Sequence, residues 1–374
     1  MRISLLLLII LYLPFTFSQL NKEITFIVTT DSVPDQLSVY ITGNHSLLGN
    51  WYPDVAQLEE YKKNEWIGKY LLPEGYQLEY KFTLGSWQHE AVDDQGMIPG
   101  NSNLHITNDT IILVHIPSWK EGSNRVVEGQ ITGTVKYHPQ MKGEGIIERD
   151  VIVWLPPGYD ESSEKSYPVL YMHDGQNIID PKTSFAGTDW RVDETVSKLA
   201  RSKKMKEIIV VGIYNTPDRL EEYSDSENGE KYLKFIVSEL KPFIDSKYRT
   251  VPQREHTAIM GSSMGGLISF IAGWRYSDVF SMAGCMSSSF YHNGEKIFDM
   301  ISENSGPKKR VKFYIDHGED GLIRGQKMYV KLTELGYVIG KNLDYFYAPN
   351  AEHTESAWAD RLERPLLFFF GNKR

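Results

Sequence analysis

The sequence is almost free of cysteine. Cys285 is the only one among 374 residues, so no disulfide can form within the chain. Stability must therefore come from an apolar core, and the 41% hydrophobic content supplies enough side chains for one. Clustered basic residues are also lacking, and the formal net charge is −9. Because a protein that follows a phosphate backbone needs a basic patch, no nucleic-acid partner is expected.

Long hydrophobic runs are lacking except at the N-terminus. Arg2 is followed by an apolar run over residues 3–13, and then by small residues at Thr16 and Ser18. This order is typical of a secretory signal peptide, here residues 1–18. The run is shorter than the roughly 20 apolar residues that span a bilayer, and no cysteine follows it for lipid attachment. The sequence predicts a secreted or periplasmic protein with no stable membrane anchor.

Two domains are predicted after the signal peptide. Residues 19–118 contain short runs of β-branched and aromatic residues between turn-forming residues, which predicts an all-β sandwich. The polar residues 119–126 are interpreted as a linker. From residue 127 to 374, mostly apolar strands alternate with helices. This alternation predicts an α/β domain, with a mostly parallel sheet covered by helices on both faces.

The segment "AIMGSSMGGL" fits the pattern Gly-x-Ser-x-Gly in one register, which selects Ser263 rather than its neighbour Ser262. A predicted strand runs into this serine and an apolar helix follows it. Strand, tight turn and helix together indicate a nucleophile elbow, in which the serine is exposed above the sheet. The first amide of the helix, that of Met264, is then a candidate oxyanion donor.

A nucleophilic serine needs a base, and on this type of fold the base follows it in the chain. Three histidines do so: His292, His317 and His353. His353 lies in a polar loop between the last predicted strand and the last predicted helix, where a base would reach the elbow. We therefore favour His353. His317 is the main alternative, and His292 is assigned to a surface loop.

The acid that orients the base should follow the predicted strand "KFYID". Asp316 is assigned to the strand end, whereas Glu319 and Asp320 lie in the loop beyond it. Asp320 is the preferred acid and Glu319 the alternative, since a shift of one residue in the loop exchanges them. A serine–histidine pair without an acid also remains open.

The second oxyanion donor is expected after the third strand, in "MHDGQNIID". Gly175 allows a close turn there, and the amide of Gln176 is the candidate donor. His173 and Asp174 would suggest a metal pair, but no further ligands follow at metal-site spacing. No metal and no cofactor are expected.

Several motifs in residues 127–372 resemble the putative esterase family, which includes esterase D, feruloyl esterases and enterochelin esterases. They are "VIVWLPPGYD", "YPVLYMHDGQNIID", "DWRVDE", "RLEEY", "YRT", "GSSMGG" and "EHTESAW". The resemblance implies an α/β-hydrolase fold and a carboxylic-ester hydrolase. It places the nucleophile on Ser263, the base on His353, the acid on Asp320 and the oxyanion loop on Gly175 and Gln176. The family's acid usually follows a Gly-Thr turn, whereas this chain has "HGEDGL", with a glutamate in place of the threonine.

The N-terminal segments "VYITGNHSLLGNW", "QLEYKFTLGSW" and "PGN" are similar to starch-binding carbohydrate modules. That similarity implies α-glucan binding, with the sugar platform on Trp51 and Trp87. An indole face suits this role because it stacks on the apolar face of a pyranose. The alternative is that Trp51 belongs to the core and the module only supports the hydrolase. Arg219 and Tyr223 follow a strand end within a charged stretch interpreted as a solvated loop, and they are candidates to line the pocket.

The sequence therefore predicts an exported serine esterase with the triad Ser263, His353 and Asp320. The expected substrate is a small-molecule or polysaccharide-linked ester, carrying an acetyl, a hydroxycinnamoyl or a siderophore acyl group. Two alternatives remain: a carbohydrate-binding protein with a vestigial hydrolase domain, and an enzyme that transfers the acyl group to a sugar.

Overall fold

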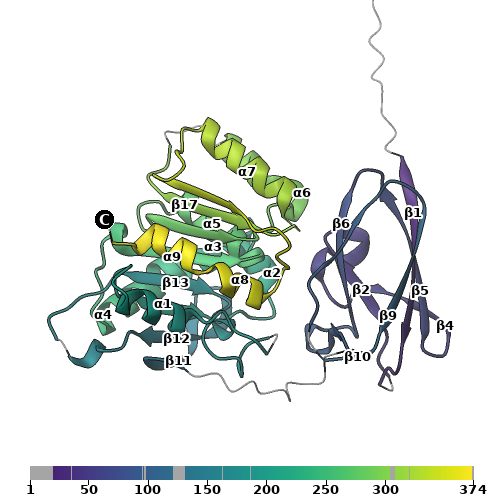
Figure 1. Ribbon diagram of the computed structural model, residues 1–374, viewed down its shortest axis with the longest axis horizontal. Coiled ribbons are helices and arrows are strands. Elements are labelled where there is room, and N and C mark those ends of the chain that lie inside the picture. The colour runs from purple at the N-terminus through teal and green to yellow at the C-terminus, as the bar shows by residue number, and fades with distance from the viewer. Residues whose placement is uncertain are drawn as a thin grey trace, which may run out of the picture.

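The computed structural model describes residues 20–372, apart from 35, 95, 97, 121–130, 162, 186, 304–307 and 320. The predicted signal peptide, most of the predicted linker and Asp320 therefore lie outside the described residues. Figure 1 shows an all-β domain followed by an α/β domain, which is the predicted order. Among the helices that the structure describes, none is long and apolar enough to cross a membrane.

The N-terminal domain is a sandwich of two four-stranded sheets. Its strands are β1 (Asn21–Thr30), β2 (Tyr40–Gly43), β3 (Ala56–Gln57), β4 (Glu59–Lys62), β5 (Glu65–Pro73), β6 (Gln77–Thr83), β7 (Ala91–Val92), β8 (Ser102–His105), β9 (Thr110–Ile116) and β10 (Ser118–Trp119). One sheet has the order β4-β5-β1-β9 and the other β3-β2-β6-β8. The core lies between them, where the ring of Phe26 on β1 packs edge-on against Tyr80 on β6 at 4.9 Å.

Trp119 belongs to this sandwich, although the sequence interpretation begins the linker at this residue. Its side chain is buried in the sandwich core, and its indole Nε1 donates to the hydroxyl of Thr30 and the carbonyl of Ser32. Strand β10 pairs with β7, which holds the chain on the sandwich through Trp119. The polar neighbours of this tryptophan in the sequence conceal its role in the core.

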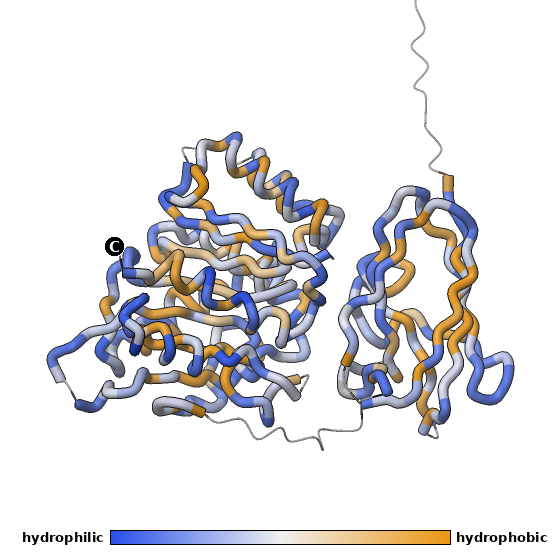
Figure 2. The backbone as a smooth tube through the Cα atoms, in the orientation of Figure 1, coloured by the Kyte–Doolittle hydropathy of each residue, from blue (hydrophilic) through white to orange (hydrophobic). Residues whose placement is uncertain are grey.

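The C-terminal domain is built on one eight-stranded sheet with the order β11-β12-β14-β13-β15-β16-β17-β18. The strands are β11 (Thr134–Gly143), β12 (Ile146–Leu155), β13 (Val169–His173), β14 (Ile209–Ile213), β15 (Thr257–Ser262), β16 (Met282–Met286), β17 (Lys312–His317) and β18 (Leu343–Tyr347). The first two strands of the order, β11 and β12, run antiparallel to their neighbours, and the other six are mutually parallel. Figure 2 shows the apolar character of the central strands, which are covered on both faces.

Helices cover both faces of this sheet, as the sequence predicts. They are α1 (Val192–Arg201), α2 (Arg219–Glu222), α3 (Glu227–Phe235), α4 (Lys241–Lys247), α5 (Met264–Arg275), α6 (His292–Glu303), α7 (Leu322–Glu334), α8 (Glu355–Arg361) and α9 (Glu363–Phe370). Helices α1, α8 and α9 pack against one face of the sheet, the face toward the viewer in Figure 1. Helices α3 to α7 pack against the opposite face.

Most of the charged stretch after β14 lies on α2 and α3, with a turn over residues 223–226 between them, which corrects the sequence interpretation of a loop. Helix α3 begins after Ser226, whose hydroxyl accepts a hydrogen bond from the amide of Gly229 at 3.0 Å. This is an ordinary N-cap, and it places the charged residues on a helix. A π-helical turn over Ile236–Leu240 then leads into α4 just before Pro242, where the proline supplies no backbone donor.

Candidate active site

Ser263 lies at the junction of β15 and α5, in the strained turn that the sequence predicts. Its backbone has φ 55° and ψ −123°, a conformation that non-glycine residues rarely adopt. Two glycines make room for it: a Cβ on Gly261 would lie 2.8 Å from Gly265, and one on Gly265 would lie 3.2 Å from the His173 Cβ. The Ser263 Oγ is 3.2 Å from the hydroxyl of Ser289. The local sequence thus places this hydroxyl just beyond the carboxyl end of β15, a central strand of the sheet.

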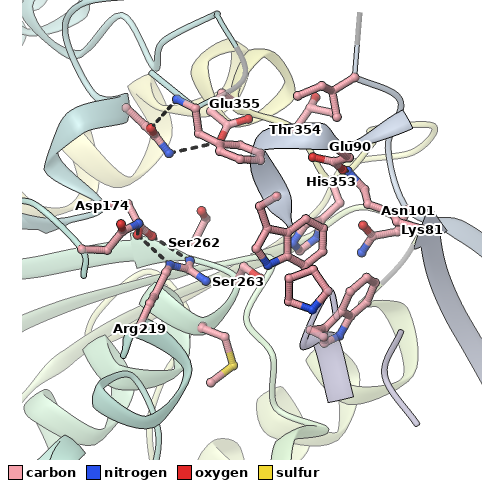
Figure 3. Close-up of a pocket in the computed structure, with 18 of the residues that line it drawn as sticks. Lys81, Glu90, Asn101, Asp174, Arg219, Ser262, Ser263, His353, Thr354 and Glu355 are labelled. Atoms are coloured by element: carbon pink, nitrogen blue, oxygen red, sulfur yellow. Dashed lines mark hydrogen bonds and ion pairs between the residues drawn. The ribbon is translucent and has the colours of Figure 1, made fainter. Parts of the chain in front are cut away.

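Ser263 lines a cavity of about 990 Å³ that lies between the two domains. Met264, Gln176 and His353 line the same cavity, so four of the predicted catalytic and oxyanion residues share one pocket. Figure 3 shows Ser263 and His353 in this pocket, with labelled residues of both domains around them.

The oxyanion-donor candidates are both placed by backbone geometry. Gln176 lies in a 3-10 turn directly after β13, and its side-chain oxygen accepts from the amide of Asn215 at 3.3 Å. Gly175 permits the turn, because a Cβ there would lie 2.4 Å from the carbonyl carbon of Gly212. Met264 is the first residue of α5, where an amide has no partner within its own helix.

His353 lies between β18 and α8, where a base was expected. Thr354 caps α8 by accepting from the amide of Ala357 at 3.3 Å, which fixes the helix start directly after the histidine. The imidazole packs edge-on against the buried ring of Trp358 at 5.0 Å. Packing and capping together define the position of His353 at the pocket wall.

The other two histidines have different surroundings. His317 is 1% exposed at the end of β17, with Nε2 2.7 Å from the hydroxyl of Tyr345 and Nδ1 2.8 Å from the carbonyl of Gly318. Both ring nitrogens are thus engaged within the core. His292 begins α6 and is partly buried, lining a separate cavity of about 450 Å³.

The acidic residues near β17 also differ in their surroundings. Asp316 is buried and accepts from Arg361 Nε at 3.0 Å, from the Tyr314 hydroxyl and from the amide of Ser287. Glu319 is exposed and accepts from the Tyr347 hydroxyl and from the Asn350 amide, both of which precede His353 in the chain. The preferred acid, Asp320, lies outside the described residues, so its role stays a prediction.

An ion pair forms one wall of the pocket. Arg219 donates to both carboxylate oxygens of Asp174, at 2.7 and 2.8 Å, and Asn215 donates to one of them at 2.6 Å. Burial alone would raise the pKa of Asp174, but Arg219 and Asn215 bring it below its usual value. Arg219 therefore lines the pocket as expected, whereas Tyr223 is fully buried beneath it.

His173, considered above as a metal ligand beside Asp174, is buried at the end of β13. Its Nδ1 is 2.7 Å from the hydroxyl of Tyr232. Burial lowers the pKa of His173 to about 3, which keeps the ring neutral. The two side chains are thus used in the packing and charge pairing of the pocket wall.

The N-terminal domain contributes an aromatic wall. Trp51 and Trp87 line the cavity with their ring centroids 6.4 Å apart and their planes inclined by 32°. The Trp51 Nε1 donates to the hydroxyl of Tyr291 at 2.6 Å, across the domain boundary. Trp51 also has φ 71°, an unusual value for a bulky residue. The predicted tryptophan pair therefore exists, and it faces the same cavity as Ser263.

Several pocket residues carry no signal in the sequence. Lys81 donates to Glu90 at 2.6 Å within the sandwich, and Asn177 donates to Glu355 at 3.3 Å within the hydrolase domain. All four line the pocket, as do Ser289 and Tyr291. They come from separate segments and separate domains, so no local pattern could have assembled them.

Glu355 gives a prediction for pH. Burial raises its pKa to about 7, so between pH about 4.3 and 7 the folded chain holds a proton that the unfolded chain has released. The free energy of unfolding should therefore fall as pH rises through this range, by up to about 1.4 kcal/mol per pH unit from this group. Glu355→Gln should remove that contribution, with urea denaturation from pH 4.5 to 8 as the measurement.

The matched control for this effect is the exposed Glu352→Gln, three residues away. A plot of its free energy of unfolding against pH should run parallel to that of the wild type. A Glu355→Gln curve that also runs parallel would contradict the prediction.

The fold and the pocket define an α/β-hydrolase domain preceded by a β-sandwich. Comparison with family models agrees with both parts: residues 147–369 match the family described as "Putative esterase", and residues 21–105 match "Starch binding domain". The first match covers more than half of the chain. The protein belongs to the putative esterase family, which places its C-terminal domain among the carboxylic ester hydrolases.

Curated relatives cover only part of this chain. It is 24% identical over 172 residues to uncharacterized protein YbbA of Bacillus subtilis, which is 42% of this chain and 64% of that protein. It is 28% identical over 143 residues to an endo-1,4-beta-xylanase/feruloyl esterase of Xylanibacter ruminicola, which is 37% of this chain and 19% of that protein. The chain thus spans less than two thirds of the length of either.

Solved structures resemble the fold over more of the chain. A ferulic acid esterase has a TM-score of 0.54 at 24% identity, covering 64% of this chain and 99% of that one. The enterobactin esterase FES of Shigella flexneri has a TM-score of 0.54 at 13% identity, covering 88% and 87%. The second likeness extends beyond the hydrolase domain.

Proposed function

We propose that the protein is an exported serine carboxylic-ester hydrolase acting on esters with a ring-bearing acyl or alcohol group. The observation that carries the proposal is the strained Ser263 at the start of α5, in a cavity shared with His353 and Gln176. Export rests on the signal-like residues 1–18. Membership of the putative esterase family supports the reaction class.

In the proposed reaction, Ser263 Oγ attacks the ester carbonyl while His353 takes its proton. The amides of Met264 and Gln176 hold the negative oxygen of the tetrahedral intermediate. His353 then gives the proton to the leaving alcohol, and an acyl group remains on Ser263. Water, activated by the same histidine, releases the acid and restores the serine. Asp320 orients His353, with Glu319 as the alternative, and these steps need no cofactor.

The aromatic wall supports a ring in the substrate. Trp51 is fixed by its bond to Tyr291 and is 8% exposed, whereas Trp87 retains more exposed surface. An indole stacks on a phenyl ring or on the apolar face of a sugar, so the hydroxycinnamoyl or carbohydrate part of an ester fits against Trp87. In this proposal the starch-binding-like domain binds part of the ester that Ser263 attacks.

The test compares methyl ferulate with ethyl acetate, which has no ring, using wild type and Trp87→Ala. Losing a stacking partner should raise KM for methyl ferulate about tenfold, equivalent to about 1.4 kcal/mol, and leave ethyl acetate hydrolysis unchanged. Trp87→Phe should restore much of the loss. The exposed Tyr61→Ala, elsewhere on the sandwich, is the matched aromatic control.

Each other outcome selects an alternative. The esterase proposal would be overturned if the wild-type protein hydrolysed none of the esters but bound to starch. That result would favour a binding protein with a vestigial hydrolase domain. Ester consumption that yields acylated sugar in the presence of acceptor sugars would indicate acyl transfer. An unchanged KM in Trp87→Ala would overturn the role of the aromatic wall alone.

A further inference from the structure

Three carboxylates that do not line the pocket meet at the start of α1. Asp189 precedes the helix, and Asp193 and Glu194 lie in its first turn. One oxygen from each lies within 4.8 Å of the other two. Asp193 is fully buried and Asp189 is 9% exposed, so this is not an ordinary solvated acidic surface. The three residues belong to the motif "DWRVDE", for which the proposed reaction has no use.

Two buried carboxylate oxygens of the cluster receive no hydrogen bond from any donor that the structure describes. Asp193 Oδ2 accepts from the amide and hydroxyl of Thr132, at 2.6 and 3.1 Å, and Asp189 Oδ2 accepts from the Arg191 amide at 2.9 Å. Asp193 Oδ1 and Glu194 Oε2 are buried, and no N–H or O–H group of another described residue donates to either oxygen. Burying carboxylate oxygens without partners is unfavourable unless a positive charge is close.

The basic side chains of α1 and its N-cap are engaged elsewhere. Arg191 donates to Asp360 at 2.9 Å, and Lys198 lies 3.7 Å from Glu363. Arg201 donates to a backbone carbonyl of its own helix. The N-terminus of α1 offers only a partial positive charge, which does not balance three carboxylates.

We propose that Asp189, Asp193 and Glu194 bind a Ca²⁺ ion. The donor set consists only of carboxylate oxygens, which suits a hard divalent cation. Ca²⁺ accepts irregular geometry and completes its shell with water, whereas Mg²⁺ requires a near-octahedral arrangement. This departs from the expectation of no metal, which considered only the spacing around His173.

The position of the site suggests what the ion stabilises. Through Thr132, Asp193 ties the start of the hydrolase domain to α1. Trp190, between the proposed ligands, packs against Trp358 at 5.4 Å, and Trp358 packs against His353 at 5.0 Å. A cation here would stabilise the segment on which the pocket wall beside His353 rests.

The test uses the full exported chain, stripped with EDTA and dialysed into metal-free buffer at pH 7.5. For a dissociation constant of about 10⁻⁴ M, 10 mM CaCl₂ should raise Tm by about 5–10 °C, and MgCl₂ by less. Tb³⁺, a luminescent substitute for Ca²⁺, should be sensitised by excitation of Trp190. Glu194→Gln should lose both responses, whereas Glu227→Gln, in the first turn of α3, should keep both.

Three results would overturn the proposal. The first is the absence of a Ca²⁺ shift and of Tb³⁺ luminescence in the wild type. A proton shared by the two acids would then explain the pair, because burial and Asp193 raise the pKa of Glu194 to about 8. The second is a Ca²⁺ response that persists in Glu194→Gln, which places the ion elsewhere. If that variant does not fold, Asp189→Asn replaces it. A Ca²⁺ response that persists in Asp189→Asn is the third overturning result.

Discussion

Ser263→Ala should abolish ester hydrolysis, with kcat lower by about a million-fold. The variant keeps the glycines, the helix and the pocket, and it removes only the hydroxyl that would carry the acyl group. Hydrolysis of p-nitrophenyl acetate and methyl ferulate, followed with enzyme in large excess, measures the residual rate. Circular dichroism and the unfolding temperature should match those of the wild type.

Ser262→Ala is the matched control for this prediction. Ser262 is the last residue of β15, 4% exposed, and the Gly-x-Ser-x-Gly register does not select it. Its removal should leave kcat within about tenfold of wild type, because it takes no covalent part in the reaction. The reverse result, with Ser262→Ala inactive and Ser263→Ala active, would overturn the assignment of the nucleophile.

His353→Ala tests whether serine and histidine act as one unit. Alone it should cost about as much as Ser263→Ala, and the double variant should lose little more, since residues of a triad are strongly non-additive. Losses that multiply in the double variant would show that His353 acts independently of Ser263.

Glu222→Ala should lower the free energy of unfolding by about 3–5 kcal/mol. Glu222 on α2 accepts from Arg149 Nη1 at 2.9 Å and from the Thr216 hydroxyl at 2.9 Å. Its side chain and that of Arg149 are 1% and 0% exposed. Removing the carboxylate leaves the guanidinium charged, buried and unpaired over the ring of Tyr232. Urea denaturation monitored by tryptophan fluorescence measures the loss.

Two comparisons separate burial from charge pairing in this prediction. Glu227→Ala breaks a surface pair with Lys231, where the glutamate is 83% exposed, and should cost far less than Glu222→Ala because solvent screens an exposed pair. Replacing both members of the buried pair, Arg149→Met with Glu222→Leu, should recover most of the stability lost in Glu222→Ala. Equal costs for Glu222→Ala and Glu227→Ala would contradict the argument.

The sequence predicts best what a short segment determines by itself. The strained turn at Ser263 depends on Gly261, Gly265, the end of β15 and the start of α5, all within ten residues. His353 could be favoured from its order in the chain. The choice between His353 and His317, however, needed the structure, which shows the His317 ring hydrogen-bonded to Tyr345 within the core. The charged stretch after β14 has the composition of a solvated loop, and the cap at Ser226 that begins α3 is a single hydroxyl, which gives only a weak signal in the sequence.

The rest of the site depends on contacts between distant segments. Trp51 and Trp87 could be identified as a pair, yet nothing local shows that Trp51 would donate to Tyr291, 240 residues later. The ion pair of Lys81 and the buried Glu90 reaches the cavity from a different domain. Such contacts form only when the two domains pack together. The local sequence of one domain therefore does not indicate which residues of the other it will contact.

The placement of Trp51 and Trp87 on a different domain from Ser263 has a consequence for how this enzyme could diverge. The groups proposed to break the ester all lie on the α/β domain, while the indole wall lies on a domain with its own core. If the proposed roles hold, the groups that react and the tryptophans that contact the ring of the substrate are encoded in separate stretches of the gene. Exchange or drift of the first 120 codons could change which esters are accepted without altering the residues that cleave them.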